Sequence, residues 1–139
     1  MRIALVASRF NAEVTELMTA EAEKRIAELG QSHAGTVRVP GAFDAPLAVQ
    51  RVLVRHDVDA VVVVGAVITG DTDHDQVLMQ ATAKTLQELA LAHDKPVMLA
   101  ITGPGMTVEQ ARERIGYAAE AVKACVELHE ALAAEAGRH

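Results

Sequence analysis

The chain of 139 residues has the length of one domain with a sizeable core, and 50% of its residues are hydrophobic. Its formal net charge of −6 argues against a nucleic-acid groove, because phosphate backbones select for clustered Lys and Arg. With two Phe, one Tyr and no Trp, the chain has too few aromatic side chains for base-stacking platforms or an aromatic membrane anchor.

The single cysteine and the short apolar runs exclude further classes. Cys125 alone cannot form an internal disulfide framework or a thiolate metal cluster, and the apolar stripe around it at helical spacing predicts a core position. No apolar run approaches the roughly 20 residues of a membrane span. Residues 1–8 begin a strand at once, without a separate hydrophobic signal region. We therefore expect a cytoplasmic protein.

The first part of the chain predicts a strand, a helix and a second strand. Residues 2–7 form a short buried-strand run. Residues 12–29 are amphipathic at helical spacing, opened by Asn11 as the N-cap and stopped by Gly30. Residues 35–39, GTVRV, are rich in β-branched side chains and predict the second strand.

The rest of the chain repeats this alternation. A helix is predicted at about 44–55, with a proline in its first turn, where a missing N–H costs little. Residues 59–65 contain four consecutive valines and suit a strand covered on both faces. A third helix at about 73–93 precedes a fourth strand at 96–101. Thr107 opens the last helix with a capping box.

Strictly alternating strands and helices predict an α/β fold, a single three-layer αβα sandwich with a four-stranded parallel sheet and right-handed crossovers. We expect the flavodoxin-like strand order 2-1-3-4. In that order, ligands bind beyond the carboxyl ends of strands 1 and 3, at the topological switch point. The segments expected there are residues 8–11 and 66–74.

Residues 65–76, GAVITGDTDHDQ, place three aspartates and a histidine at this expected site. The aspartates stand at positions 1, 3 and 5 of a calcium loop that would begin at Asp71. Such a loop needs Gly at position 6 and Glu at position 12, where this chain has Gln76 and Thr82. A strand also precedes the segment instead of a helix. The sequence therefore argues against a calcium site.

A phosphate-binding loop is closer to the pattern. Residues 65–72 read G-x-x-x-x-G-D-T, one residue away from the nucleotide-binding pattern G-x-x-x-x-G-K-[ST]. Asp71 stands where a lysine would reach the phosphates, which argues against nucleoside triphosphates. The backbone N–H groups of the loop still lead into a helix N-terminus, which favours binding of a single small phosphate. The positive charge that the missing lysine would supply then has to come from another part of the protein.

Two interpretations of His74 remain open. It can be a surface histidine in a first helical turn, paired with Asp71 or Asp75. It can also be a general acid–base group, because a helix N-terminus disfavours the imidazolium whereas neighbouring aspartates favour it. The opposition of these two effects favours proton transfer near neutral pH.

Four motifs stand at the predicted strand–helix junctions: SRFN (8–11), VPGAFDAPLA (39–48), GAVITGDTDHD (65–75) and ITGPGMT (101–107). Together they resemble the 6,7-dimethyl-8-ribityllumazine synthase family, and its archaeal branch in particular. Members of that family condense 5-amino-6-(D-ribitylamino)uracil with 3,4-dihydroxy-2-butanone 4-phosphate in riboflavin biosynthesis, releasing phosphate and water without a cofactor or metal. The resemblance implies one lumazine synthase domain over 1–139, and the sequence of the C-terminal tail predicts that about 134–139 are frayed.

The resemblance implies a pyrimidine site formed by two of these motifs. Phe10 would lie against the ring and Asn11 would help to bind it. Val67 and Ile68 would present backbone groups to the same ring. The ribityl pocket would be lined by Ala42, Phe43 and Asp44. The carboxylate of Asp44 would accept hydroxyl hydrogen bonds, where many relatives use a glutamate.

The resemblance also implies a phosphate site that two subunits share. The phosphate would be held by backbone and hydroxyl donors of Gly70, Asp71 and Thr72. His74 would move protons. The family assembles as pentamers, in some members as a shell of pentamers, with each active site between two subunits. Leu99 and Arg114 of the neighbouring subunit would cover the ring and reach the phosphate.

Two positions depart from many bacterial relatives. Leu99 stands where they carry an aromatic side chain, so ring stacking from that side is lost. A lysine that they use in the last helix has no secure match, since Lys123 sits a turn too far. Arg114 has no carboxylate three or four residues away, which fits a role on phosphate, with a solvated surface arginine as the alternative.

Two other functions fit part of the pattern. An archaeal-type riboflavin synthase, a paralogue of similar fold that dismutates the lumazine product, would lack the phosphate-handling loop and the SRFN motif found here. A non-catalytic flavin or nucleotide binder of flavodoxin type would sandwich its flavin between aromatic side chains, of which this chain has few. The sequence therefore favours the synthase, with small-molecule substrates and no nucleic-acid or membrane partner.

Overall fold

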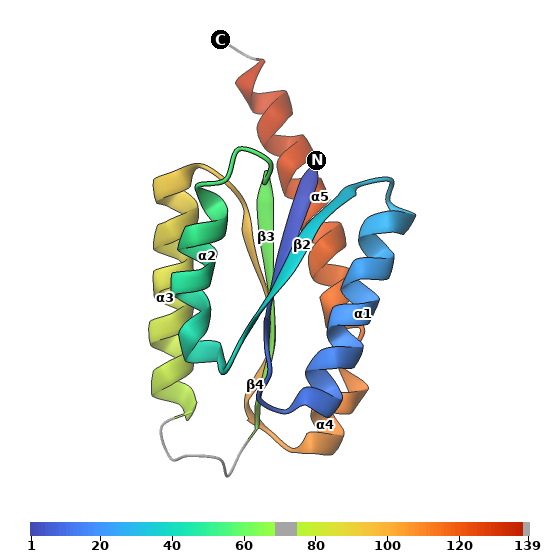
Figure 1. Cartoon of the computed structure of the whole chain (residues 1–139), viewed down its shortest axis with the longest axis vertical. Coiled ribbons are helices and arrows are strands. Elements are labelled where there is room, and N and C mark those ends of the chain that lie inside the picture. Colours follow the sequence, from blue (N-terminus) through green and yellow to red (C-terminus); the bar gives the residue numbers. More distant parts are fainter. Residues whose placement is uncertain (69–74, 138–139) are drawn as a thin grey trace.

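The computed structural model describes residues 1–68 and 75–137. A four-stranded parallel sheet forms the middle layer of the molecule (Figure 1). Its strands are β1 (Arg2–Ser8), β2 (Ser32–Val39), β3 (Ala60–Ile68) and β4 (Val97–Met106). Their spatial order is β2-β1-β3-β4, which confirms the predicted order 2-1-3-4.

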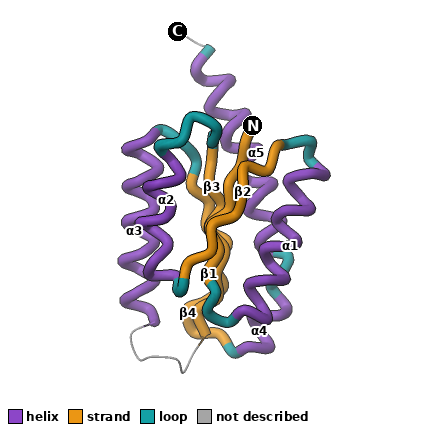
Figure 2. Tube along the Cα trace, viewed as in Figure 1, coloured by secondary structure: helices purple, strands orange, loops and turns teal. Residues whose placement is uncertain are grey.

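Helices cover both faces of the sheet, which confirms the predicted three layers (Figures 1 and 2). They are α1 (Ala12–Glu28), the 3-10 helix η1 (Ala42–Asp44), α2 (Ala45–Leu53), α3 (Asp75–His93), α4 (Val108–Glu113) and α5 (Tyr117–Ala136). Helices α2 and α3 pack on one face, called here the α2–α3 face. Helices α1, α4 and α5 pack on the other, the α1–α5 face.

The central strands β1 and β3 are buried between these two layers. Along β1, Ile3 and Leu5 face the α1–α5 side, where they pack with Met18 of α1. Val6 faces the opposite side and packs with Val49 of α2. Both faces of each strand are therefore apolar, which explains why these strands read as continuous hydrophobic runs in the sequence.

Cys125 of α5 lies in the α1–α5 core with no exposed surface, which confirms the predicted core position. Burial raises the pKa of its thiol to about 12. The thiol therefore remains protonated at neutral pH and packs as a small apolar side chain, because only the thiolate is strongly nucleophilic.

Several boundaries differ from the sequence prediction. Strand β2 begins at Ser32 instead of residue 35, and β3 continues to Ile68 instead of ending at 65. The predicted last helix is divided into α4 and α5, because the chain turns at 114–116, where Gly116 has a low helix propensity. The capping box at its start is confirmed, with Thr107 Oγ1 accepting a hydrogen bond from the Gln110 N–H at 3.2 Å. Strand β4 continues past the predicted end to Met106, and the second helix begins with the 3-10 turn of η1.

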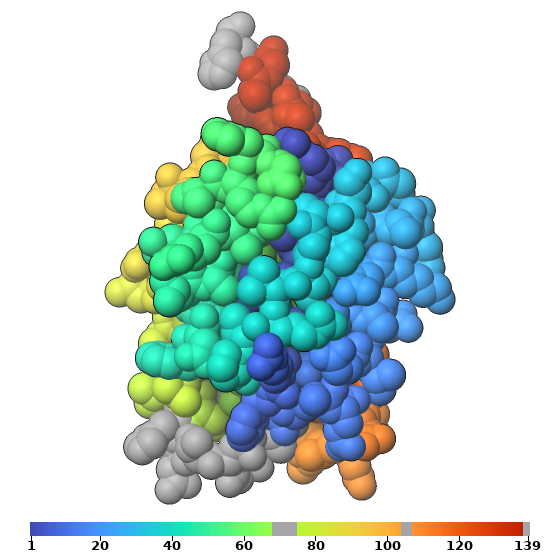
Figure 3. Space-filling model, viewed as in Figure 1, coloured from blue at the N-terminus to red at the C-terminus, as the bar shows by residue number. Residues whose placement is uncertain are grey.

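The C-terminal helix extends past the sheet. Its last turns project beyond the rest of the molecule, and α5 ends at Ala136, within the tail that was expected to fray (Figure 3). In the part of the chain that the structure describes, none of the helices combines the length and the apolar character that a membrane crossing requires.

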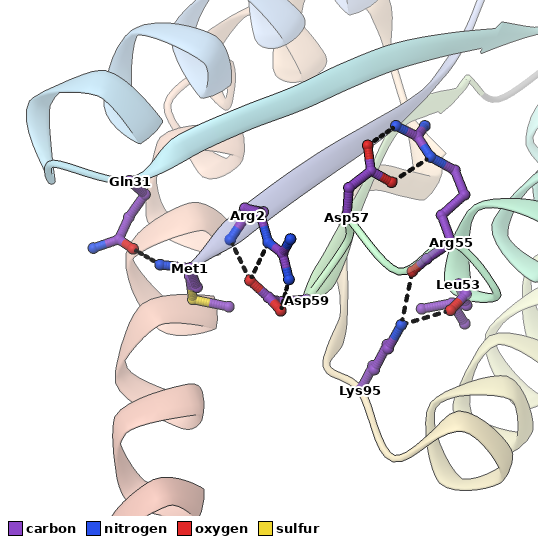
Figure 4. Close-up of polar contacts among 8 residues, drawn as sticks. All are labelled: Met1, Arg2, Gln31, Leu53, Arg55, Asp57, Asp59 and Lys95. Carbon is purple, nitrogen blue, oxygen red and sulfur yellow. Dashed lines mark hydrogen bonds and ion pairs between the residues drawn. The ribbon is translucent and has the colours of Figure 1, made fainter.

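Contacts between loops hold the end of the sheet that lies opposite the strand carboxyl ends (Figure 4). Asp59 Oδ2 accepts hydrogen bonds from the backbone N–H of Arg2 at 2.6 Å and from Arg2 Nε at 3.2 Å. Lys95 Nζ donates to the carbonyls of Leu53 at 2.7 Å and Arg55 at 3.1 Å. These contacts join β1 to the start of β3, and the loop before β4 to the end of α2.

The ion pair of Arg2 and Asp59 makes stability depend on pH. Hydrogen bonding to the Arg2 guanidinium lowers the pKa of Asp59 in the folded chain, so its stabilising contribution is present above the unfolded pKa and is lost as pH falls through the folded pKa. We expect Asp59→Asn to lower the free energy of unfolding by about 1 kcal/mol or less at pH 7, because the pair is partly exposed.

In urea unfolding curves the difference should shrink as pH falls below about 4, the unfolded pKa, and should vanish only below the lowered folded-state pKa of Asp59, where the carboxyl is protonated in both states. Glu127→Gln, on the exposed surface of α5, is the matched control and should change little at either pH. An equal loss of stability at pH 7 and in acid would show that the charge of Asp59 contributes nothing.

Candidate active site

A pocket of about 200 Å³ opens at the carboxyl ends of β1 and β3, on the α2–α3 face. Its walls come from the loop after β1, the turn containing η1, the end of β3 and the first turns of α3. The lining residues are Phe10, Gly41, Ala42, Phe43, Ala66, Val67, Asp75, Leu78, Met79 and Thr82. Four predicted site residues therefore meet in one pocket: Phe10, Ala42, Phe43 and Val67.

Two of the three aromatic side chains of the chain line this pocket while keeping much of their surface exposed. Phe10 is 55% exposed and Phe43 is 63% exposed. Folding normally buries side chains of this size, and exposed apolar surface beside a pocket is characteristic of a binding site. The two rings come from different loops and offer apolar surface to a planar organic ligand.

Asn11 stands at the N-cap of α1, but its side chain does not cap the helix. Its backbone adopts the left-handed conformation with φ of 62°, which asparagine tolerates better than most residues. The side chain reaches across to β3, where Nδ2 donates a hydrogen bond to the Ala66 carbonyl at 3.0 Å. The last β1–β3 pair is Ala7 with Val64, so this bond continues the connection between the two strands beyond the end of their ladder.

Asp44 lies beside the pocket without lining it. One carboxylate oxygen, Oδ2, accepts a hydrogen bond from the Gly41 N–H at 3.0 Å, which closes the η1 turn. The side chain is exposed, so the carboxylate still has acceptor sites for ligand hydroxyl groups. The η1 turn therefore explains locally why Ala42 and Phe43 face the pocket while Asp44 stands at its edge.

Strand β3 carries the two predicted backbone positions to the end of the sheet. Val67 lines the pocket, and Ile68 is the last residue of the strand and pairs with Met106 of β4. The residues predicted to handle phosphate and protons lie outside the described part of the chain: Gly70, Asp71, Thr72 and His74. Asp75, the first residue of α3, is described and lines the pocket.

Leu99 and Arg114 do not line this pocket within a single chain. Leu99 pairs with Val63 in β4, the edge strand, and is 45% exposed. Arg114 is the C-cap of α4 on the opposite face of the sheet, and its guanidinium lies 5.9 Å from the centre of the Tyr117 ring. Leu99 is therefore exposed on the edge strand and Arg114 is partly exposed, and neither belongs to the described lining of the pocket.

The chemistry of the pocket suits an organic ligand. Apart from Asp75 and Thr82, the described residues that line it have apolar side chains or none, and backbone groups at the strand ends can add polar selectivity. Within residues 1–68 and 75–137, no group of three or more His, Cys, Asp or Glu is placed to hold a metal ion.

Comparison with known proteins identifies the family. The family model described as 6,7-dimethyl-8-ribityllumazine synthase matches residues 1–133. The chain belongs to the lumazine synthase family. A lumazine synthase of Halobacterium salinarum is 48% identical over 131 residues, which cover 94% of this chain and 98% of the relative.

Two further lumazine synthases give the same result. The protein of Methanopyrus kandleri is 46% identical over 128 residues, covering 92% of this chain and 91% of the relative. That of Methanothermobacter thermautotrophicus is 42% identical over 132 residues, covering 95% of each chain. The chain therefore spans almost the full length of these relatives.

The α3 wall of the lumazine synthase pocket was missed by sequence reasoning. Leu78, Met79 and Thr82 line the pocket together with Asp75, at positions i+3, i+4 and i+7 relative to Asp75 along one face of α3. Their i, i+3, i+4 spacing was available in the sequence and reads equally well as an ordinary core stripe. Leu78 is 37% exposed, so at least this position faces the open pocket instead of the core.

Proposed function

We propose that this chain condenses 5-amino-6-(D-ribitylamino)uracil with 3,4-dihydroxy-2-butanone 4-phosphate to give 6,7-dimethyl-8-ribityllumazine. Membership of the lumazine synthase family supports the reaction. The location of the active site rests on one observation. Phe10, Phe43 and Val67, which come from three separate motifs, line one pocket at the switch point of the sheet.

The pocket supports a definite placement of the pyrimidine substrate. The ring would lie against Phe10 and take hydrogen bonds from backbone groups of Val67 and Ile68, with Asn11 beside it. The ribityl chain would follow the η1 turn and bond to the exposed carboxylate of Asp44. The apolar walls exclude water from the ring and leave its polar edge to the backbone.

The chemistry begins with attack of the pyrimidine amine on the ketone carbonyl, which forms an imine and releases water. Elimination of phosphate follows, and the ring closes with loss of a second water. Holding two substrates in reacting geometry supplies a large part of the acceleration. His74 would transfer protons in these steps, and backbone donors of Gly70, Asp71 and Thr72 would stabilise the departing phosphate.

We further propose that the chain forms a single domain over 1–139 and acts in the cytoplasm as a pentamer or a shell of pentamers. In that assembly, Leu99 and Arg114 would complete the site of the adjacent subunit. Both side chains are at least partly exposed and neither belongs to the described lining of the pocket of its own chain, which supports this role. A ring of heterologous contacts places the same pair of surfaces together at every boundary.

Incubation with both substrates, with each alone and with lumazine alone tests the proposed reaction. The lumazine chromophore should appear only when both substrates are present. Lumazine supplied alone should persist, whereas the paralogous riboflavin synthase would convert it to riboflavin. No change in any of the four mixtures would favour a non-catalytic binding protein and would contradict the proposal.

The proposed reaction needs no metal, so metal removal gives a separate prediction. Dialysis against a strong chelator should leave the rate of lumazine formation unchanged, and added calcium should not raise the melting temperature, because a bound ion would stabilise the folded state. A chelator-sensitive rate that calcium restores would instead revive the calcium-loop interpretation of the segment beginning at Asp71.

A further inference from the structure

Strand β4 departs from regular pairing where it passes the pocket end of β3. Ala66 pairs with Thr102, and the next pair is Ile68 with Met106. One residue of β3, Val67, is therefore opposite the longer segment 103–105 of β4. Irregularities of this kind often occur beside active sites, where they redirect backbone groups.

Gly103 makes the close approach at this irregularity. Its φ is +101°, a backbone conformation that residues with a side chain rarely adopt. A Cβ at this position would lie 2.1 Å from the carbonyl oxygen of Val67 and 3.1 Å from its carbonyl carbon. Only glycine therefore allows the two strands to approach as they do, and the Val67 backbone forms one side of the contact.

The opposite side of the same segment is held by the loop that follows β1. Asn11 Nδ2 donates to the Ala66 carbonyl at 3.0 Å, immediately before Val67 in the strand. The end of β3 is thus fixed between a hydrogen bond from one neighbour and a close backbone contact with the other. Val67 itself lines the pocket, so its position sets the geometry of the pocket floor.

We propose that Gly103 is a positioning residue that sets the place of the Val67 backbone at the pocket, and through it the affinity for the pyrimidine substrate. The second half of this inference rests on the proposed function, whereas the first half does not. A side chain at 103 would force the two strands apart by roughly 1 Å, because nonbonded atoms do not approach within 2.1 Å.

The test compares Gly103→Ala with Gly35→Ala. Gly35 of β2 also has a positive φ, +109°, but a Cβ there would meet nothing within 4 Å. Both variants therefore carry the backbone strain of alanine at positive φ, and only Gly103→Ala adds the clash with Val67. The measurements are crystal structures of both variants and the dissociation constant of the ribitylaminouracil substrate, obtained by direct titration without turnover.

Gly103→Ala should displace the Val67 carbonyl and weaken pyrimidine binding by roughly 10- to 100-fold, the range expected when a binding group is misplaced by about 1 Å. The KM for the butanone phosphate should change less than the affinity for the pyrimidine. Gly35→Ala should leave both quantities close to those of the wild type.

Each outcome separates the positioning role from the proposed function. An unmoved Val67 and an unchanged dissociation constant in Gly103→Ala would overturn the inference, and so would equal losses in both variants. If Val67 moves only in Gly103→Ala but the wild type binds no pyrimidine, the positioning of the backbone is supported and the proposed function is overturned.

Discussion

Mixed assemblies of His74→Ala and Arg114→Ala chains are expected to regain roughly a quarter of the wild-type activity, although each variant alone should be strongly impaired. In the proposed ring, each site combines His74 of one subunit with Arg114 of its neighbour. Random mixing of equal amounts gives both intact residues at one boundary in four. The activity of the mixed assemblies is to be compared with the average activity of the two separate variants, and it should exceed that average.

The geometry of the single chain is the reason for this expectation. The pocket lies on the α2–α3 face, whereas Arg114 ends α4 on the opposite face. Arg114 is not among the described residues that line the pocket of its own chain, which fits the proposal that it completes the site of a neighbouring subunit. Co-assembly is confirmed by native mass spectrometry, and unmixed variants combined after assembly serve as the control. Activity that stays at the average in confirmed mixed rings would refute the shared site.

His74→Ala is expected to slow lumazine formation by roughly 10- to 100-fold without abolishing it. This loss is at or below the low end of the rate contributions of general acid–base groups, because positioning of the two substrates supplies much of the rate acceleration. Steady-state kinetics with both substrates would measure it. His56→Ala, at an exposed loop position, is the matched control and should retain wild-type rates. A rate within twofold of the wild type would remove His74 from the mechanism.

The parallel sheet could be predicted from the sequence because the alternation of strands and helices is a local pattern, whereas the strand order was expected by analogy with flavodoxin-like folds. Alternation of strand and helix periods requires parallel strands with crossovers, and the switch point follows from the order. Phe10 comes after predicted strand 1 and Val67 after predicted strand 3, so both were expected at the carboxyl end of the sheet. They line one pocket there.

The remaining features depend on contacts between distant segments. Asn11 has the sequence signature of a helix cap, yet its side chain bonds to Ala66, which is 55 residues away. Gly103 looked like part of a loop, whereas its close approach to Val67 extends β4. Arg112 was available for an intrahelical pair with Glu109 and instead pairs with Glu13 of α1 at 2.9 Å. Propensity and spacing do not encode such pairings.

The amount of phosphate released per lumazine formed tests the central claim most directly. A coupled phosphate assay run beside the lumazine absorbance on the same reaction gives both quantities. The proposed condensation predicts equal amounts of the two products throughout the time course, with neither formed when one substrate is omitted. Phosphate release without lumazine, or riboflavin formed from lumazine alone, would contradict the assignment of this reaction to the chain.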